Sequence, residues 1–169
     1  RIFLVGANDG MLHAFDMESQ SATWRKFYLP HHRILGHAID NGTVYIQSFY
    51  EMIALNTATG KNKWTKKIRS ISNSSAPCVS CKNGILFITL NQSTSLKVLR
   101  ASDGSELWNF TTQSGSNGPP AIADGLVFFS TKDRKLFAVD AKTGKKVWSV
   151  DCKFAANSGI AVATNYIPK

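Results

Sequence analysis

Among the side chains of this chain, the cysteines are the most evident candidates for chemistry, but their spacing does not form a complete metal or redox site. Cys78 and Cys81 form a C-x-x-C pair, a spacing that elsewhere binds zinc or exchanges disulfides. The surrounding residues are typical of a strand and a turn. On a strand, residues three apart point to opposite faces and lie about 10 Å apart, beyond the reach of a disulfide. We interpret them as ordinary, partly buried thiols, with a redox or zinc role as the alternative.

The histidines and carboxylates also fall short of a catalytic or metal-binding set. His31 and His32 are adjacent and could ligate a metal, but no third ligand is evident, which favours a surface loop. A hard cation needs clustered carboxylates, whereas the chain has 11 acidic residues and most of them stand in turns. No nucleophile elbow, phosphate-binding loop or H-E-x-x-H motif is present. The sequence therefore predicts no complete active site.

The composition is that of a folded domain with a basic surface. The chain has 169 residues, of which 43% are hydrophobic and 18% charged, and its net charge is +9. No apolar run approaches the roughly 20 residues that cross a bilayer. The chain starts on a strand without an initiator methionine or signal peptide, so we expect a trimmed piece of a longer protein. The positive charge allows an anionic partner without identifying it.

The four tryptophans mark an internal repeat. They are separated by 40, 44 and 40 residues, and each ends a related string of 11 residues: AFDMESQSATW, ALNTATGKNKW, VLRASDGSELW and AVDAKTGKKVW. Short apolar strands and polar turns recur around each string, and no segment keeps a helical period. Four strands in about 40 residues is typical of a blade of a β-propeller. We predict an all-β propeller-type array with repeat units at 1–36, 37–73, 74–115 and 116–157.

The strings resemble the tryptophan-docking motif, A-x-D-x-x-x-G-x-x-x-W, of the quinoprotein (pyrroloquinoline quinone, PQQ)-like propeller repeats. The motif positions that match are Ala14, Asp16, Trp24, Ala54, Gly60, Trp64, Gly104, Trp108, Ala138, Asp140, Gly144 and Trp148. The departures are Gln20 in place of glycine, Asn56 and Arg100 in place of aspartate, and Val98 in place of alanine. The resemblance implies that all four tryptophans wedge between neighbouring sheets, so we expect Trp148→Ala to destabilise the fold by about 3–5 kcal/mol.

The sequence indicates the number of blades less directly than it indicates the fold. Propellers of this family usually have seven or eight blades, whereas this chain holds material for four. Residues 158–169 resemble a closing or next-blade strand, and four whole blades result if that strand pairs with the first. The chain is then half of a larger propeller, a closed ring of four blades, or one of two copies that join as eight. We favour the first.

The family implies two classes of function. Its quinoprotein dehydrogenases hold calcium or a lanthanide over the quinone, use an aspartate base, and often carry an adjacent cysteine pair, which this chain lacks. Its other members include the outer-membrane assembly lipoprotein BamB, sensor domains and binding propellers. We therefore expect a non-catalytic protein-binding or scaffold module in the periplasm, outside the cell or on its surface, with no cofactor evident. The alternative is a fragment of a PQQ-dependent alcohol or sugar dehydrogenase, with PQQ and calcium.

The candidate partner-binding residues come from turns that differ between the repeats. Phe49 and Tyr50 stand where the sister repeats have polar turns, and Lys132 with Arg134 could steer an acidic protein. The alternative is that the two aromatics fold back onto the core. Lysines also collect in the docking strings and predict a basic rim, while specific nucleic-acid binding is disfavoured because no reading helix or aromatic-studded basic strand appears.

Overall fold

The computed structural model describes residues 2–6, 11–27, 34, 36–48, 50–68, 78–89, 94–116, 118–153 and 160–162. These residues form four antiparallel sheets and no helix. The first sheet contains β1 (Ile2–Gly6), β2 (Met11–Asp16) and β3 (Ala22–Phe27). The second contains β4 (Gly36–Asp40), β5 (Thr43–Gln47), β6 (Glu51–Asn56) and β7 (Asn62–Lys67). The third contains β8 (Cys78–Lys82), β9 (Ile85–Thr89), β10 (Ser95–Arg100) and β11 (Glu106–Thr111). The fourth contains β12 (Ala121–Ala123), β13 (Leu126–Ser130), β14 (Lys135–Asp140) and β15 (Lys146–Asp151).

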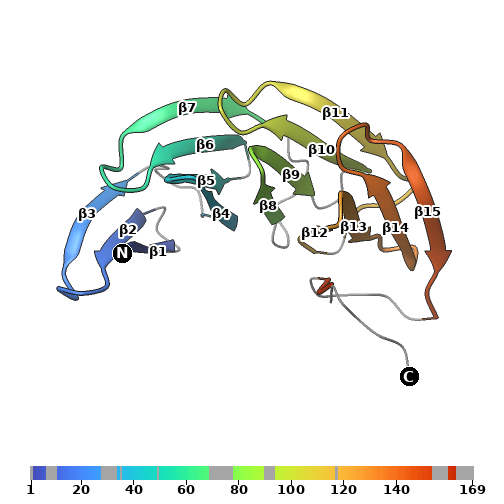
Figure 1. Cartoon of the computed structure of the whole chain (residues 1–169), viewed down its shortest axis with the longest axis horizontal. Coiled ribbons are helices and arrows are strands. Elements are labelled where there is room, and N and C mark those ends of the chain that lie inside the picture. Colours follow the sequence, from blue (N-terminus) through green and yellow to red (C-terminus); the bar gives the residue numbers. More distant parts are fainter. Residues whose placement is uncertain are drawn as a thin grey trace.

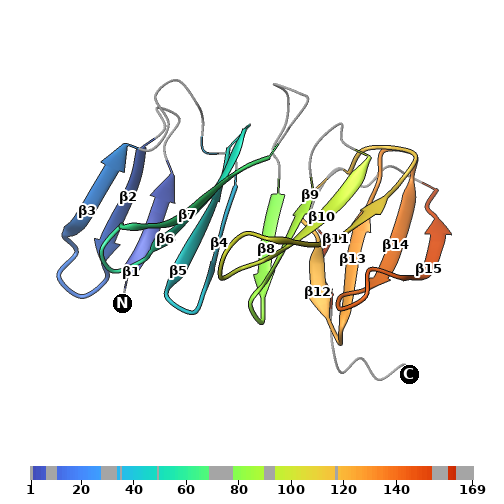
Figure 2. The same cartoon turned by 90° about the horizontal axis from the view of Figure 1, so that it is seen from above.

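The sheets follow one another along an arc. Each is a meander in which consecutive strands pair, so the strand order in space equals the order in sequence. Figure 1 shows β3, β7, β11 and β15 on the outer side of the arc and β4, β8 and β12 on its inner side. Figure 2 shows the four sheets standing side by side. This is the predicted propeller-type arrangement, and the all-β prediction is confirmed.

The inner hairpins are set by local turn chemistry. Two-residue loops join β4 to β5, β8 to β9 and β12 to β13, with the sequences Asn41-Gly42, Asn83-Gly84 and Asp124-Gly125. Both residues of each loop have positive φ, for example 45° at Asn41 and 67° at Gly42. These are the dihedral angles that a type I′ hairpin requires, and its twist matches that of the flanking strands. The sequence of these turns therefore fixes the register of the inner strands.

The docking strings form a second, larger turn between the two outer strands of each sheet. In the fourth sheet, Asp140 Oδ1 accepts hydrogen bonds from the backbone N–H groups of Lys142 and Thr143 and from Thr143 Oγ1. Asn56 accepts the same three bonds in the second sheet, which explains why asparagine replaces aspartate without changing the turn. The turn closes when Gly144 N–H donates to Asp140 O at 2.9 Å, with Gly144 at φ 71°.

Each docking tryptophan lies opposite the small residue that opens its string. Trp24 pairs with Ala14, Trp64 with Ala54 and Trp148 with Ala138, and a β-bulge follows each pair. The third sheet has Val98 at this position and keeps both the pairing with Trp108 and the bulge. The four repeats therefore share one backbone geometry despite their different sequences.

The tryptophans join neighbouring sheets by packing on glycine. A Cβ atom added at Gly60 would lie 2.9 Å from the Trp24 ring, and one at Gly144 would lie 2.7 Å from the Trp108 ring. The remaining interface, between the second and third sheets, pairs Gly104 with Trp64 in the same way. Real side chains essentially never approach so closely, so the indole occupies space that only glycine leaves open. Glycine is required twice, by its positive φ and by this contact.

Two of these indoles also donate a hydrogen bond to the next sheet. Trp24 Nε1 donates to Thr57 O at 2.8 Å, and Trp64 Nε1 donates to Ala101 O at 3.0 Å. Trp108 Nε1 is buried and has no partner. Stacking on glycine is thus common to all three interfaces, whereas the hydrogen bond is not.

The hydrophobic core is divided between the three interfaces. The first cluster, between the first two sheets, includes Leu12, Val44 and Ile53, with Trp24 packed against it. Two further clusters fill the second and third interfaces and include Trp64 and Trp108, respectively. As a result, every residue of β5 is buried, because its sheet has a neighbouring sheet on each side. Every residue of β15, at the end of the arc, is exposed.

One expectation about the ends of the array is wrong, and another lies mostly outside the described residues. Trp148 does not wedge between sheets in the structure: it is 40% exposed, and no further sheet among the described residues packs against β15. The closing or next-blade strand expected at 158–169 stays a prediction, because only residues 160–162 of it are described and these three lie outside any strand. Among the described strands β1 pairs only with β2, so the first sheet contains three described strands.

The different environments of the tryptophans give a stability test. We expect Trp64→Ala to lower the free energy of unfolding by about 3–5 kcal/mol, because it empties a packed interface and removes a hydrogen bond. Trp148→Ala is the matched control and should cost about 1–2 kcal/mol, because the ring is already partly in water. Urea unfolding of both variants measures the two values. Equal losses would contradict the difference in packing.

The docking turns should weaken in acid. Hydrogen bonds lower the carboxyl pKa of Asp140, chiefly from the Thr143 hydroxyl, and that of Asp103 to about 2, chiefly from the Ser105 hydroxyl. A lowered pKa stabilises the fold above the ordinary value of 3.8, and this contribution disappears as pH falls through the folded-state pKa. We expect the melting temperature to fall from about pH 4 to pH 2. Asp140→Asn should reduce that fall, since Asn56 makes the same bonds without titrating. An unchanged pH profile in this variant would contradict the assignment.

Candidate functional site

The turn between β5 and β6 holds Tyr50 in a fixed backbone position. Ser48 Oγ accepts hydrogen bonds from the backbone N–H groups of Tyr50 and Glu51, at 3.2 and 2.9 Å. The Tyr50 carbonyl accepts a further bond from Ile68 N–H at 2.7 Å. The chain is therefore held on both sides of the residue, and the Tyr50 side chain is 50% exposed.

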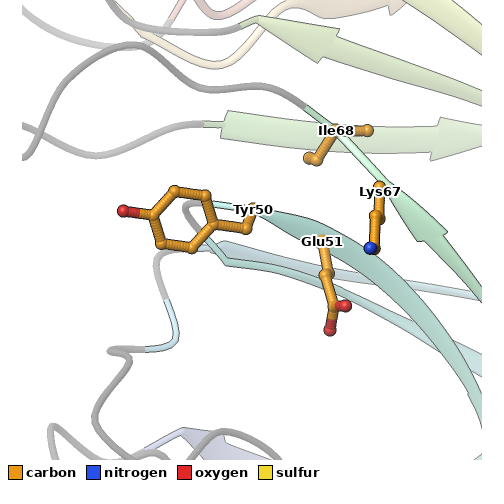
Figure 3. Close-up of a pocket in the computed structure, with 4 residues that line it drawn as sticks. All are labelled: Tyr50, Glu51, Lys67 and Ile68. Atoms are coloured by element: carbon orange, nitrogen blue, oxygen red, sulfur yellow. The ribbon is translucent and has the colours of Figure 1, made fainter.

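A pocket of about 510 Å³ opens beside this tyrosine. Its described lining consists of Tyr50, Glu51, Lys67 and Ile68, shown in Figure 3. Ile68 is buried and belongs to the core between the second and third sheets. Part of the pocket lining therefore belongs to the core, while Tyr50 contributes a half-exposed ring.

The pocket combines an aromatic ring with both signs of charge. Glu51 and Lys67 are directly paired residues on the neighbouring strands β6 and β7. Such a pair presents a carboxylate and an ammonium group close together on the strand ends. This combination suits a peptide or protein surface with an apolar anchor and polar flanks.

The structure separates the residues that the sequence grouped as partner-binding candidates. Tyr50 lines the pocket, and its exposure argues against the alternative that this ring folds back onto the core. Phe49 lies outside the described residues. Lys132 and Arg134 are exposed in the equivalent turn of the fourth sheet, between β13 and β14, and do not line the pocket. Sequence reasoning missed Glu51, which follows Tyr50 in the chain, and Ile68, which the pairing of β7 with β6 brings beside Tyr50.

The predicted basic rim lies at the opposite end of the sheets from Tyr50. Lysines of the docking turns are exposed there: Lys61, Lys63, Lys142, Lys145 and Lys146. Because consecutive hairpin turns of a meander alternate between its two ends, the docking turns of all four sheets share one end. Lys67 stands at the other end, close to the pocket.

A buried amide without a partner lies next to the Tyr50 turn. Gln47 is the last residue of β5 and is fully buried, and neither its amide nitrogen nor its amide oxygen is hydrogen-bonded. The last residue of β9 is also a buried polar one, Thr89, but its hydroxyl donates to Gly118 O at 2.9 Å. An unpaired buried amide is unfavourable, so Gln47 marks a weak point of the core at the Tyr50 end of the sheet.

The described residues provide no metal or redox centre. No three His, Cys, Asp or Glu side chains among them come together as a ligand set. His31 and His32 lie outside those residues. Burial raises the pKa of the Cys81 thiol to about 12, helped by the Asp40 carboxyl at 3.6 Å. A thiol with that pKa is protonated at neutral pH, so Cys81 has the character of a structural residue. Among the described residues, no group of three such side chains is therefore available to hold a calcium ion over a quinone.

Within its described ranges the chain contains no helix of the length and apolar character that a bilayer crossing requires.

Comparison with known proteins places the fold in a family. The model of the family described as "outer membrane protein assembly factor BamB" matches residues 8–80 and again residues 72–165. The dehydrogenase subunit of the quinone-dependent alcohol dehydrogenase of Gluconobacter oxydans (strain 621H) is 38% identical over 79 residues, which cover 40% of this chain and 10% of that protein. The outer membrane protein assembly factor BamB of Nitrosomonas eutropha is 27% identical over 111 residues, which cover 65% of this chain and 26% of that protein.

A solved structure shows the same fold at low identity. The crystal structure of BamB from Moraxella catarrhalis superimposes with a TM-score of 0.73 and 20% sequence identity, over 89% of this chain and 48% of that one. The chain thus spans about half the length of that structure and about a quarter or less of the two curated relatives. Both a dehydrogenase and an assembly factor match, so the likeness shows the architecture and does not distinguish between the two activities.

The unpaired Gln47 amide gives a test of the site. We expect Gln47→Met to raise the free energy of unfolding by about 1–3 kcal/mol, because methionine has a similar volume and removes two unpaired polar atoms. Urea unfolding measures the change, and Thr89→Val is the matched control that should destabilise, since it breaks a bond to Gly118 O. A loss of stability in Gln47→Met would contradict the unpaired state and indicate a bound partner for this amide.

Proposed function

We propose, because the chain belongs to the BamB-like family of PQQ-like propeller repeats, that it is a non-catalytic module that binds a protein partner. The observation that carries the proposal is the fixed, half-exposed Tyr50 beside a pocket whose lining belongs in part to the core. A ring held in place by its backbone loses little freedom on binding, which favours it as an anchor.

The partner surface follows from what the sheets leave available. Their interiors are occupied by packing between blades, so binding falls to the two ends, where the turns are exposed. Tyr50, with Phe49 beside it in sequence, would supply the apolar anchor at one end. Lys132 and Arg134 would attract an acidic partner to that same end. We place the protein in the periplasm, outside the cell or on its surface, as expected for a family named after outer membrane assembly.

The second candidate is a fragment of a PQQ-dependent oxidoreductase. It is favoured by the match to the Gluconobacter oxydans dehydrogenase subunit, at a higher identity than the match to BamB but over a shorter segment. Against it stands the lack of a metal-ligand set among the described residues. A catalytic centre would then have to draw on residues beyond those described, with PQQ and calcium as added components.

The proposed anchor is tested by substitution at the pocket. We expect Tyr50→Ser to weaken the affinity for a partner captured on the immobilised chain at least tenfold, which corresponds to about 1.4 kcal/mol. Tyr50→Phe is the matched control, because it keeps the ring and should retain most of the affinity. Surface plasmon resonance measures both variants, and their melting temperatures should stay near that of the parent.

Two results would contradict the proposal. Unchanged affinity in Tyr50→Ser would show that the pocket is not the binding surface. Reduction of a dye by the chain with PQQ, calcium and simple alcohols or sugars, well above the rate without protein, would instead support the oxidoreductase.

A further inference from the structure

A second pocket lies between the second and third sheets, at the opposite end of the sheets from Tyr50. Its volume is about 320 Å³, at the low end of the roughly 300–1,000 Å³ that is typical of small-molecule sites. Its lining includes Asp40, Thr43, Tyr45 and Lys63 of the second sheet and Gly84 and Ser102 from two turns of the third. We call it the Asp40 pocket. Ala101 N–H donates to Gly84 O at 2.9 Å, which ties the two turns of the third sheet together and fixes that wall.

The polar residues of the Asp40 pocket replace apolar residues of the neighbouring repeats. Strand register aligns Thr43, Tyr45 and Lys63 with Ile85, Phe87 and Leu107 in the third sheet, and with Leu126, Phe128 and Val147 in the fourth. Asp40 aligns with Lys82 and Ala123. Those sheets form the same backbone without a carboxylate, a hydroxyl or an ammonium group at these positions. The fold itself therefore does not require the polar set.

One oxygen of the Asp40 carboxylate is left for a ligand. Its Oδ2 accepts a hydrogen bond from Gly84 N–H at 3.2 Å, and the Cys81 thiol and the Asn41 amide also donate to Oδ2, at 3.6 and 3.4 Å. Among the described residues, Asp40 Oδ1 has no hydrogen-bond donor. The bonds at Oδ2 hold the carboxylate across the interface, while Oδ1 keeps its capacity to accept.

The Lys63 ammonium group supplies the opposite charge. Its Nζ donates to Thr43 Oγ1 at 2.6 Å, so two of its three protons have no acceptor within the described part of the chain. Lys63 and Asp40, both described, line the same pocket and form no ion pair with each other. Burial is the chief cause that raises the pKa of Tyr45, so its hydroxyl stays protonated and can donate as well.

This combination of groups favours a ligand that carries both charges. A lone anion would be repelled by the Asp40 carboxylate, and a lone cation would be repelled by the Lys63 ammonium group. A zwitterion satisfies both residues, because its ammonium group donates to Asp40 Oδ1 and its carboxylate accepts from Lys63 Nζ. The small volume limits the rest of such a ligand to a few atoms.

We propose that the Asp40 pocket binds a free α-amino acid with a short side chain, its ammonium group on Asp40 and its carboxylate on Lys63. The site is independent of the proposed protein-binding function, since it lies at the other end of the sheets from Tyr50. The ligand contacts the second sheet and two turns of the third, so its binding stabilises their interface.

The test uses alanine and two analogues that each lack one charge. Alanine carries the groups common to all α-amino acids, whereas propionate lacks the ammonium group and ethylamine lacks the carboxylate. Two-dimensional ¹H–¹⁵N NMR of the whole chain follows the backbone amides of Gly84 and Ser102 during each titration, with Gly125 in the equivalent turn of the fourth sheet as the reference. We expect alanine to shift the first two signals with a Kd of about 1 mM or tighter, and each analogue to bind at least tenfold more weakly.

Substitutions assign the two charges to their residues. Asp40→Asn keeps an oxygen for Gly84 N–H and should weaken alanine binding at least tenfold. The double variant Thr43→Ile, Lys63→Leu installs the residue types of the third sheet, so it should fold with a melting temperature near that of the parent and lose alanine binding. Lys61→Gln is the matched control, because Lys61 is exposed in the neighbouring docking turn and does not line the pocket, and it should bind alanine as the parent does.

Four results would overturn the proposal. The first is the absence of shifts at Gly84 and Ser102 with alanine at about 20 mM, well above the expected Kd. The second is an affinity for propionate or ethylamine equal to that for alanine, which would indicate recognition of one charge only. The third is unchanged affinity in Asp40→Asn or in the double variant. The fourth is an equal loss in Lys61→Gln, which would indicate attraction by the general positive charge.

Discussion

The packing of an indole on a glycine of the next sheet is the contact on which the rest of the structure depends. A sheet of three or four short strands cannot bury its apolar faces alone, and its stability depends on a neighbour. The docking turn provides a fixed distance and orientation for that neighbour, because the glycine has no side chain and the ring is rigid. Each hydrophobic cluster forms around one such contact. The arc in Figure 1 is the repetition of this single interface.

This constraint also decides where binding can occur. Turns at the docking end share the same bulge, so the backbone geometry is kept in all four sheets although the capping residue differs, with Arg100 at that position in the third sheet. Turns at the other end carry no such requirement and differ in sequence, which is how Tyr50 comes to stand exposed above the pocket. The turns that packing constrains therefore lie at one end of every sheet, and the turns that can vary in sequence lie at the other end. The proposed partner surface is at the end with the variable turns.

The same division explains why related activities share this architecture. The relatives include a quinone-dependent alcohol dehydrogenase subunit and outer membrane assembly factors, and both match segments that consist of docking repeats. The docking contacts build the scaffold. What a given propeller does is then set by the residues at the ends of its sheets, and those are the residues least constrained by packing.

The sequence by itself determined the features that arise from local chemistry. The period of the tryptophans predicted the sheets, and the glycines of the docking strings predicted turns with positive φ, because these depend on a few neighbouring residues. Only the tertiary structure decided burial. Trp108 and Trp148 end equivalent strings, yet one is wedged between sheets and the other is exposed, since burial depends on whether another sheet follows. The position of Ile68 beside Tyr50 likewise required the pairing of β6 with β7, and the unpaired amide of Gln47 depends on how its surroundings pack, which no local pattern records.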